Sequence, residues 1–407
     1  MWRAGCGLLF LVLSPQVCRA GEVRDPLFWA SEQDFLKQVD GGQFIDRLEL
    51  HLLQYAADPR WRSEWAARRT TGSGLFVEYG STTTDELYVN GHIALNLFPL
   101  ERFQIRYDRR DYQDGRFDVP EQRFDALWYP GSGWALVLSG WPVFDKEDAS
   151  LGLGLRIGGP RSRNALELRV MNERFIWNWK TDGDVRFTRR PLRLLADGYY
   201  ETGPWRVRGS IDWGLEYAAG ETGPGGRSTR GFQRFGDVEV EYAPGGWAAA
   251  ARLTGAALAR AQAEPAGAAC RLDRTWGRTV LTLRRDLGRW TASALAGWAS
   301  QRDELASPSV PAGDYVQDSL LWGVEGGFQA TRGLQLRLGY LGSLQHAERT
   351  LQLPGPLVAG EAEVYLDKAH VRAVYAFQPG MAIELLLSQA LRGGRFGGGS
   401  VNALLAL

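Results

Sequence analysis

Histidines are scarce in this chain of 407 residues. Only His51, His92, His346 and His370 occur, and Ser388, on a predicted strand, has no evident histidine partner. No serine lies in a nucleophile-elbow pattern, and the chain contains no HExxH zinc motif, no CxxC pair and no phosphate-binding glycine loop. The sequence therefore predicts that the protein is not an enzyme, and it indicates no catalytic residue, cofactor or metal site.

Charged residues alternate with apolar residues over much of the chain. In "RFQIRYDRR" (102–110) the apolar side chains share one face, whereas Gln104, Arg106 and Asp108 share the other. The stretch "WRVRGSIDWGLEY" (205–217) repeats this period of two. Such a period is typical of strands with one apolar face, so we expect an all-β fold.

If the apolar parity faces lipid, the charged parity faces the interior. Positive and negative residues are nearly equal in number there, and Arg206 and Arg208 are expected one strand away from Asp237, Glu239 and Glu241. Two interpretations stay open and can hold together: an internal ladder of ion pairs, or a polar pore wall with a transverse field. The predicted pore-lining residues are Arg106, Asp108, Arg110, Arg123, Asp125, Glu167, Arg169, Arg206, Arg208, Asp212, Asp237, Glu239, Glu241, Arg278, Glu325, Arg337, Lys368, His370 and Arg372.

Tight turns alternate with longer polar stretches such as 259–273 and 300–318. Alternating short and long connections are typical of an up-and-down outer-membrane barrel, whose short turns face the periplasm. The alternative is a soluble β-sandwich or propeller, which does not need long loops at one end only. The turns are expected near Pro99, Gly131, Pro160, Gly203, Gly245, Gly288, Arg332 and Gly380.

The number of strands follows from these turns. Eight hairpins give sixteen strands, and "GLFVEYGS" (74–81) and "GSVNALLAL" (399–407) add one at each end. These two can pair and close the sheet, because an open edge in lipid would leave backbone groups unpaired. We expect a closed antiparallel transmembrane β-barrel of about 18 strands, or 16 to 20 if the 180–200 region is misread.

Four tryptophans follow tight turns directly, on the apolar parity of their strands. They are Trp134, Trp205, Trp247 and Trp290. An indole buries its ring and hydrogen-bonds through its N–H at a membrane–water boundary. We expect these four residues at the periplasmic interface of the membrane.

The first 72 residues differ from the rest. Residues 1–20 have Arg3, a short apolar run and small residues before a site after Ala20, and they predict a cleaved signal peptide. Residues 21–72 have helical spacing, and they are expected to form a short helical segment that lies in the periplasm, plugs the barrel or is a flexible leader. The barrel is expected over 73–407.

The net charge of the whole chain is zero, so the chain has no overall field that would attract nucleic acid.

From about residue 74 the chain resembles the Gram-negative outer-membrane β-barrel class, and its N-terminal segment followed by about eighteen strands is also similar to the Wzi capsule-assembly barrel family. The final Leu407 departs from the class, whose members usually end in an aromatic residue. The class resemblance implies an outer-membrane location and contact with membrane lipids and the barrel-assembly machinery. It implies a porin-like channel for small hydrophilic solutes or an exported polymer; the Wzi resemblance implies a non-conducting barrel that binds surface polysaccharide.

Overall fold

The computed structural model describes most of the chain from Gly72 onward. The described residues are 72–81, 87–114, 118–141, 149–175, 185–223, 225–263, 267, 269–308, 312–351, 358–378, 380–392, 394 and 396–406. The predicted signal peptide and the predicted helices of the N-terminal segment therefore lie outside the described residues. Within this part of the chain, no helix has the length and apolar character needed to span a membrane.

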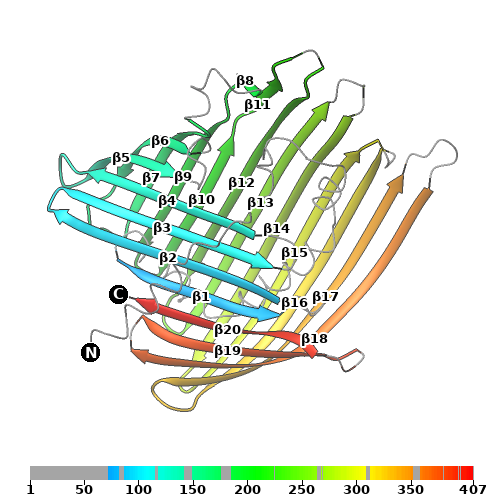
Figure 1. Cartoon of the computed structure of the whole chain (residues 1–407). Helices are drawn as coiled ribbons and strands as arrows, with labels where there is room; N and C mark the ends of the chain where they lie inside the picture. Colours follow the sequence, from blue (N-terminus) through cyan, green and yellow to red (C-terminus); the bar gives the residue numbers. More distant parts are fainter. Residues whose placement is uncertain are drawn as a thin grey trace.

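Regular structure in the described residues is entirely β, in twenty segments that form one antiparallel sheet (Figure 1). The segments are β1 Gly74–Ser81, β2 Leu87–Leu100, β3 Phe103–Asp114, β4 Asp118–Trp128, β5 Trp134–Trp141, β6 Ser150–Ile157, β7 Ala165–Asn172, β8 Val185–Arg189, β9 Leu192–Thr202, β10 Trp205–Gly214, β11 Tyr217–Glu221, β12 Ser228–Tyr242, β13 Trp247–Ala263, β14 Ala269–Leu287, β15 Trp290–Ala306, β16 Gly313–Gln329, β17 Leu334–Leu351, β18 Val358–Gln378, β19 Met381–Ala390 and β20 Phe396–Ala406.

Two pairs of these segments are single strands with an interruption. β8 and β9 are separated by Arg190 and Pro191, and β10 and β11 by Leu215 and Glu216. β9 pairs with β10 and β8 pairs with β11, so the two interrupted strands run side by side. Proline has no N–H for the ladder, which explains the first interruption. The described sheet therefore has eighteen strands, as the turn spacing predicted.

The sheet closes through its first and last strands. β1 pairs with β20 over its whole length, from Gly74 opposite Ala406 to Ser81 opposite Gly399. The prediction that residues 74–81 and 399–407 join the two edges is confirmed. Closure gives every strand of the sheet a neighbour on both sides, which a structure in hydrocarbon requires.

The eight predicted tight turns all lie at the end of the barrel where β1 begins and β20 ends. They connect β2 to β3, β4 to β5, β6 to β7, β9 to β10, β12 to β13, β14 to β15, β16 to β17 and β18 to β19. Gly203 and Gly288 have positive φ values of 55° and 71°, a conformation that glycine adopts without steric cost. The turn positions read from the sequence are confirmed.

Two of the long polar stretches at the opposite end, 259–273 and 300–318, are mostly strand, so the connections within them are shorter than predicted. β13 continues to Ala263 and β14 starts at Ala269, and β15 continues to Ala306 before β16 starts at Gly313. Cross-strand pairing covers most of both predicted stretches. Outside lipid a strand needs only its hydrogen-bond ladder and no apolar face, so polar composition alone did not mark where these strands end.

The wall of the barrel has an uneven height. Strands β12–β18 have 15 to 21 residues, whereas β5, β6 and β7 have 8 each. A tilted strand needs only about 9–11 residues to cross a membrane. On β15 the outward residues are apolar from Trp290 to Trp298 and then change to Ser300, Arg302 and Glu304. The strands β12–β18 therefore extend beyond the apolar band, as a raised wall away from the turns (Figure 1).

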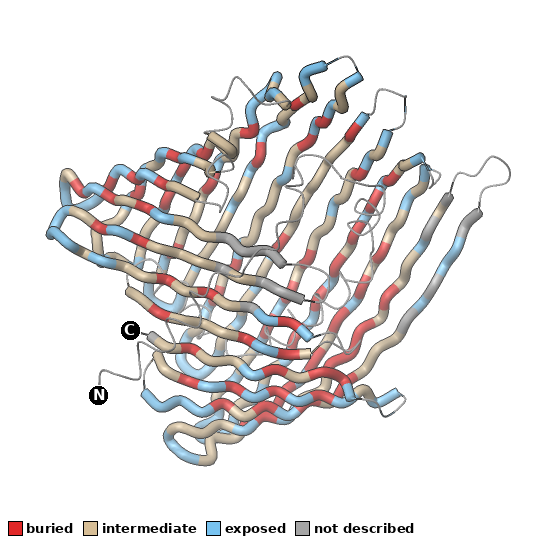
Figure 2. The backbone as a smooth tube through the Cα atoms, in the orientation of Figure 1, coloured by how far each residue is buried: buried red, intermediate tan, exposed pale blue. Residues whose placement is uncertain are grey.

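The two faces of the sheet differ as the period of two predicted. Exposed apolar side chains such as Leu153, Leu281 and Leu338 lie outside, and most buried charged and polar side chains lie on the other parity, inside. Figure 2 shows the resulting alternation of buried and exposed positions along each strand. An apolar outer face and a polar inner face are the pattern of a transmembrane barrel.

Closure can be tested at the seam between β1 and β20. Each N–H of β20 faces either β1 or β19. Val401→Pro therefore removes one ladder hydrogen bond and leaves a carbonyl unpaired in hydrocarbon, which should cost several kcal/mol. We expect loss of the heat-modifiable band on electrophoresis after refolding into detergent. Val401→Ala keeps the N–H and should retain the band; equal migration of both variants would contradict a closed seam.

Candidate lumen site

The structure places the predicted pore-lining residues on the inner parity of the barrel wall. Register places Arg106 opposite Asp125 and Glu241 opposite Arg206, and it places Glu167 opposite Asp197, which the predicted set omitted. The side chain of Arg110 lies outside the described residues. Buried members of the set are Arg106, Asp125, Glu167, Arg169, Glu239, Glu241, Arg278, Glu325, Arg337, Lys368, His370 and Arg372.

A dense group of charges crosses the inner face of β3–β7. We name Arg106, Arg123, Asp125, Arg156, Glu167 and Arg169 the β3–β7 cluster. Arg106 donates to Asp125 at 2.8 Å and to Glu167 at 2.5 Å, and Arg156 donates to Glu167 at 2.6 Å. Arg169 also contacts Glu167. Because β3 and β7 are not adjacent, these contacts show that the wall curves strongly here.

The β3–β7 cluster is enclosed and contains more cations than anions. Four arginines share Asp125 and Glu167, and Asp197 lies at the edge, 3.7 Å from Arg169. The hydroxyl of Ser139 adds a 2.6 Å hydrogen bond to Asp125. Burying a charge costs free energy unless an opposite charge pairs with it. Each shared carboxylate therefore stabilises several guanidinium groups.

Arg156 was not in the predicted set, although it is fully buried in this cluster. The run "LGLGLRI" has glycines at 152 and 154 on the same parity as Arg156. Glycine carries no polarity, so the alternation was weak there. Arg156 could have been predicted by assigning alternate positions to the two faces, starting from the turn after Ile157.

A ladder of ion pairs continues along β9–β14. Arg206 contacts Glu241 at 3.1 Å, and Arg208 contacts Glu239 at 2.8 Å. The expected proximity of these arginines to the acidic run on the neighbouring strand is therefore observed. Three further contacts extend the ladder: Arg252 to Asp237, Arg193 to Asp212, and Arg278 to the hydroxyl of Thr254.

Glu325 is the centre of a second enclosed group on β16–β19. It accepts from Arg337 at 3.1 Å and pairs with the imidazole of His370 at 3.0 Å, and Arg372 lies at 3.5 Å. Glu384, which the predicted set omitted, lies 3.7 Å from Arg372. His370 is thus a buried partner of a carboxylate. It also lies opposite Ser388 in the β18–β19 register, a neighbour that the sequence did not reveal, but the Ser388 hydroxyl donates to the carbonyl of Gly398.

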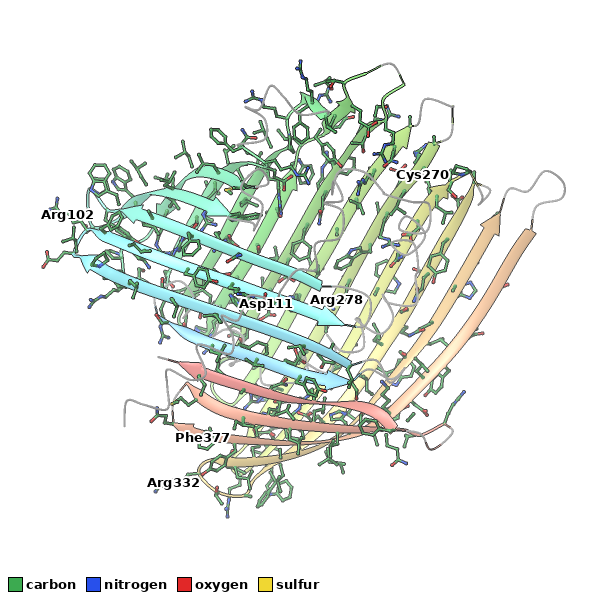
Figure 3. All side chains as sticks on the ribbon, viewed as in Figure 1. Arg102, Asp111, Cys270, Arg278, Arg332 and Phe377 are labelled. Atoms are coloured by element: carbon green, nitrogen blue, oxygen red, sulfur yellow. The ribbon has the colours of Figure 1, made fainter. Side chains whose placement is uncertain are left out.

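Charge is distributed unevenly along the barrel axis. The two enclosed clusters lie near the turn end, where Figure 3 also shows Arg102 and Arg332; Cys270 lies at the opposite end. Toward that opposite end, the inward positions of β15–β17 carry Gln301, Gln317 and Gln345, together with the buried Asp303, which pairs with Arg274 of β14.

The four predicted interfacial tryptophans are the first residues of β5, β10, β13 and β15. Trp134, Trp205, Trp247 and Trp290 are 42%, 47%, 44% and 60% exposed. Trp205 packs on Tyr242 with ring centroids 4.5 Å apart, across the β10–β12 register. The four indoles lie at the turn end on the outer face, where the apolar band begins.

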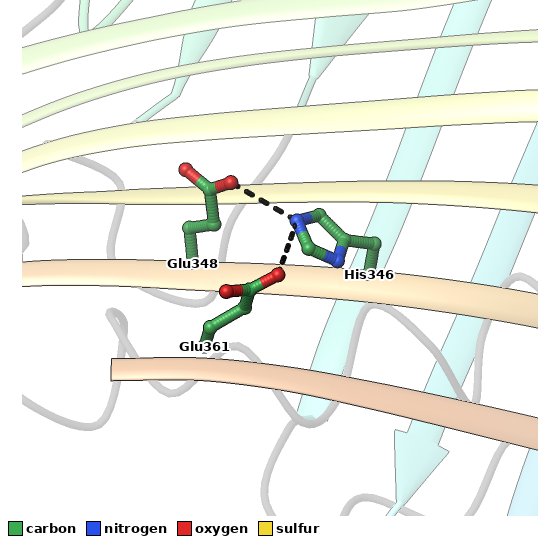
Figure 4. A group of neighbouring side chains, drawn as sticks. All are labelled: His346, Glu348 and Glu361. Carbon is green, nitrogen blue, oxygen red and sulfur yellow. Dashed lines mark hydrogen bonds and ion pairs between the residues drawn. The ribbon is translucent and has the colours of Figure 1, made fainter. Parts of the chain in front are cut away.

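One group of potential metal ligands lies outside the lumen. His346 and Glu348 of β17 and Glu361 of β18 bring one imidazole and two carboxylates within 4.8 Å of one another (Figure 4). These residue types bind Zn²⁺, but all three side chains are largely exposed, and metal binding requires a neutral imidazole. The hydrogen bond from His346 to Glu348 raises the pKa of the imidazole, which favours the charged form.

No protein-family model and no curated protein matches the chain. Among solved structures, OmpTdeltaL8 of Vibrio cholerae has a TM-score of 0.39 and 13% identity over 82% of this chain and 99% of its own. OccK10 of Pseudomonas aeruginosa has 0.37 and 11% over 83% and 98%. The CymD monoaromatic hydrocarbon channel has 0.31 and 7% over 84% and 88%. TM-scores this low say nothing about function.

Glu167 should be essential to the stability of the β3–β7 cluster. Glu167→Gln removes the charge that Arg106, Arg156 and Arg169 share, and should lower the free energy of unfolding by about 3–5 kcal/mol. Urea unfolding of the refolded barrel measures this. Glu216→Gln is the control, because its ion pair with Arg189 is exposed on both sides and should contribute about 1 kcal/mol or less. Equal losses would contradict the cluster's role.

The pKa of His346 should depend on Glu348. In the folded protein this pKa is raised, so the ion pair is fully present below about 6.5, the usual histidine value, and is lost as the pH rises through the folded value. Glu348→Gln should move the titration of the His346 ring protons to lower pH, as measured by NMR. Glu304→Gln on β15 should leave it unchanged. An unchanged His346 titration in Glu348→Gln would refute the contact.

Proposed function

We propose that the protein is a passive channel for small hydrophilic solutes in the bacterial outer membrane. The observation that carries this proposal is a closed barrel of eighteen strands with an apolar outer face and a charged inner face. A barrel of this size encloses more space than its own wall side chains fill, and barrels of about 16–18 strands leave an aqueous passage.

The orientation follows from the two ends of the barrel. Short turns of outer-membrane barrels face the periplasm and longer elements face outward. The end with the eight turns and Trp134, Trp205, Trp247 and Trp290 is therefore assigned to the periplasmic side. The raised wall of β12–β18 then stands on the extracellular side, and solutes would reach the charged clusters last.

The cluster on β3–β7 favours anionic solutes. Four arginines there face Asp125, Glu167 and Asp197, and a further carboxylate, Asp108, lies opposite Arg123 in the register and pairs with His92. Arg123 is the most accessible of the four, with its side chain 19% exposed, whereas Arg156 is enclosed. Arginine-rich constrictions select anions electrostatically, so Arg123 is the residue most able to act on a passing solute.

A second function is favoured by a different observation. Inward side chains of the raised wall, such as Gln301 and Gln317, are 1% and 0% exposed, which an open passage would not produce. This supports a non-conducting barrel that binds or helps assemble surface polysaccharide. In that case the raised wall would be the binding surface.

Planar-bilayer recording of the refolded protein tests the channel. We expect ohmic openings with a preference for anions, and a lower anion-to-cation permeability ratio for Arg123→Gln, because a lumen cation is removed. Arg302→Gln is the matched control, since this arginine lies on the outer face of β15 and is 58% exposed.

Absence of conductance, together with polysaccharide binding by the same preparation, would overturn the channel and support the second function. Conductance with equal selectivity in wild type and Arg123→Gln would retain the channel and refute the role of the β3–β7 cluster.

A further inference from the structure

A hollow of about 520 Å³ lies on the outer, lipid-facing side of β12–β15. Its outward-facing lining is apolar: Trp205 and Tyr242 lie at one side, Leu281 and Leu283 in the middle, and alanines on both flanks of these leucines. The four alanines are Ala249, Ala251, Ala294 and Ala296. The hollow is separate from the lumen and from the proposed channel.

The register explains why the surface is hollow here. Ala249, Leu283 and Ala294 are direct neighbours in one row across β13–β15, and Ala251, Leu281 and Ala296 form the next row. Alanine on both flanks of a leucine ridge leaves two furrows that run along the strands. On β15 the furrow lies between Trp290 and Trp298, the two ends of the apolar band.

An arginine lies at the turn end of these furrows. In the row below, Arg285 is opposite Trp247 on one side and Ala292 on the other, so it points outward with them. Its guanidinium carbon lies 4.6 Å from the centre of the Trp247 ring. Among the described residues, no carboxylate forms an ion pair with Arg285. A cation on a lipid-facing surface is costly unless an anion meets it at the membrane boundary.

We propose that this surface binds one glycerophospholipid of the periplasmic leaflet, with an acyl chain in the furrows and the phosphate on Arg285. Guanidinium groups bind phosphate through paired, charge-assisted hydrogen bonds. The ring of Trp247 holds the guanidinium at the boundary, and the apolar hollow begins one row deeper in the membrane. Charge and apolar surface are therefore arranged in the order of a lipid headgroup and its chain.

A second copy of the chain fits this surface less well. A two-fold contact centred on the hollow brings the same patch of both copies together, so the Arg285 residues would approach each other. Like charges in a medium of low dielectric repel strongly. The occupant must also fill the hollow. A second copy would present the same hollow, which cannot fill the first.

Native mass spectrometry of the delipidated full-length mature barrel in detergent tests the site. The probes are phosphatidylethanolamine and a diacylglycerol with the same chains, which lacks the phosphate. We expect one tightly bound phosphatidylethanolamine, with the diacylglycerol bound at least about tenfold more weakly, the ratio expected for one charge-assisted contact. Arg285→Gln should remove this preference, and Arg285→Lys should retain part of it.

Filling the furrows tests the chain site separately. The double variant Ala249→Leu, Ala294→Leu should weaken binding of both lipids, and the smaller Ala249→Val, Ala294→Val serves if the first fails to refold. Matched controls are Arg332→Gln, at the turn between β16 and β17, and Ala126→Leu, outward on β4 opposite Ile105. Both controls should bind as wild type does.

Wild-type binding in both the Arg285 and the furrow variants would overturn the proposal. Unchanged lipid binding with loss of dimers or trimers in the furrow variants would also overturn it, and would make the hollow an interface between copies. None of these readouts involves conductance, so failure of the channel would leave this test intact.

Discussion

An unpaired backbone N–H or C=O group in hydrocarbon costs several kcal/mol, and the architecture of this protein follows from avoiding that cost. The pairing of β1 with β20 removes the only two edges that the sheet would otherwise have. No single strand is stable alone in this setting, so all eighteen depend on that seam. Closure also means that each side chain of a strand faces either lipid or the lumen. An alternating sequence therefore produces an apolar outer surface and a polar inner surface.

The lumen surface is organised by sharing of charge. Glu167 and Glu325 each hold several cationic side chains, and both are enclosed by their partners. Enclosed groups of this kind connect strands that are not adjacent, such as β3 with β7 and β16 with β18. In the channel function proposed above, the arginines on β3–β7 would act on the charge of a solute as well as on stability.

The outer surface is less uniform than a simple apolar band. The rows of alanine beside Leu281 and Leu283 make a hollow in it, and Arg285 adds a charge at its margin. The raised wall of β12–β18 adds a second asymmetry, because it extends on one side only. One flank of the barrel therefore carries both the lipid-facing hollow and the raised wall.

The sequence by itself determined the class of fold, the strand number, the eight turns and the parity of the charged residues. These are local properties: a period of two and glycine or proline turns are visible within short windows, and closure follows from the chemistry of the backbone in lipid. Glu241 and Arg206 could be placed on neighbouring strands because each lies next to a tight turn at the same end of the barrel, so both lie at the same height on strands that follow one another.

Only the tertiary structure decided where the strands end outside the membrane, which distant charges meet, and where the outer surface is hollow. Arg106 and Glu167 are 61 residues apart and on strands that are not adjacent, so their contact depends on curvature of the whole wall. Arg156 escaped prediction because its neighbours of the same parity are glycines. The ends of β13–β16 were not predicted. Sequence analysis detects strands by their apolar alternation, and a hydrogen-bond ladder outside lipid does not need that pattern.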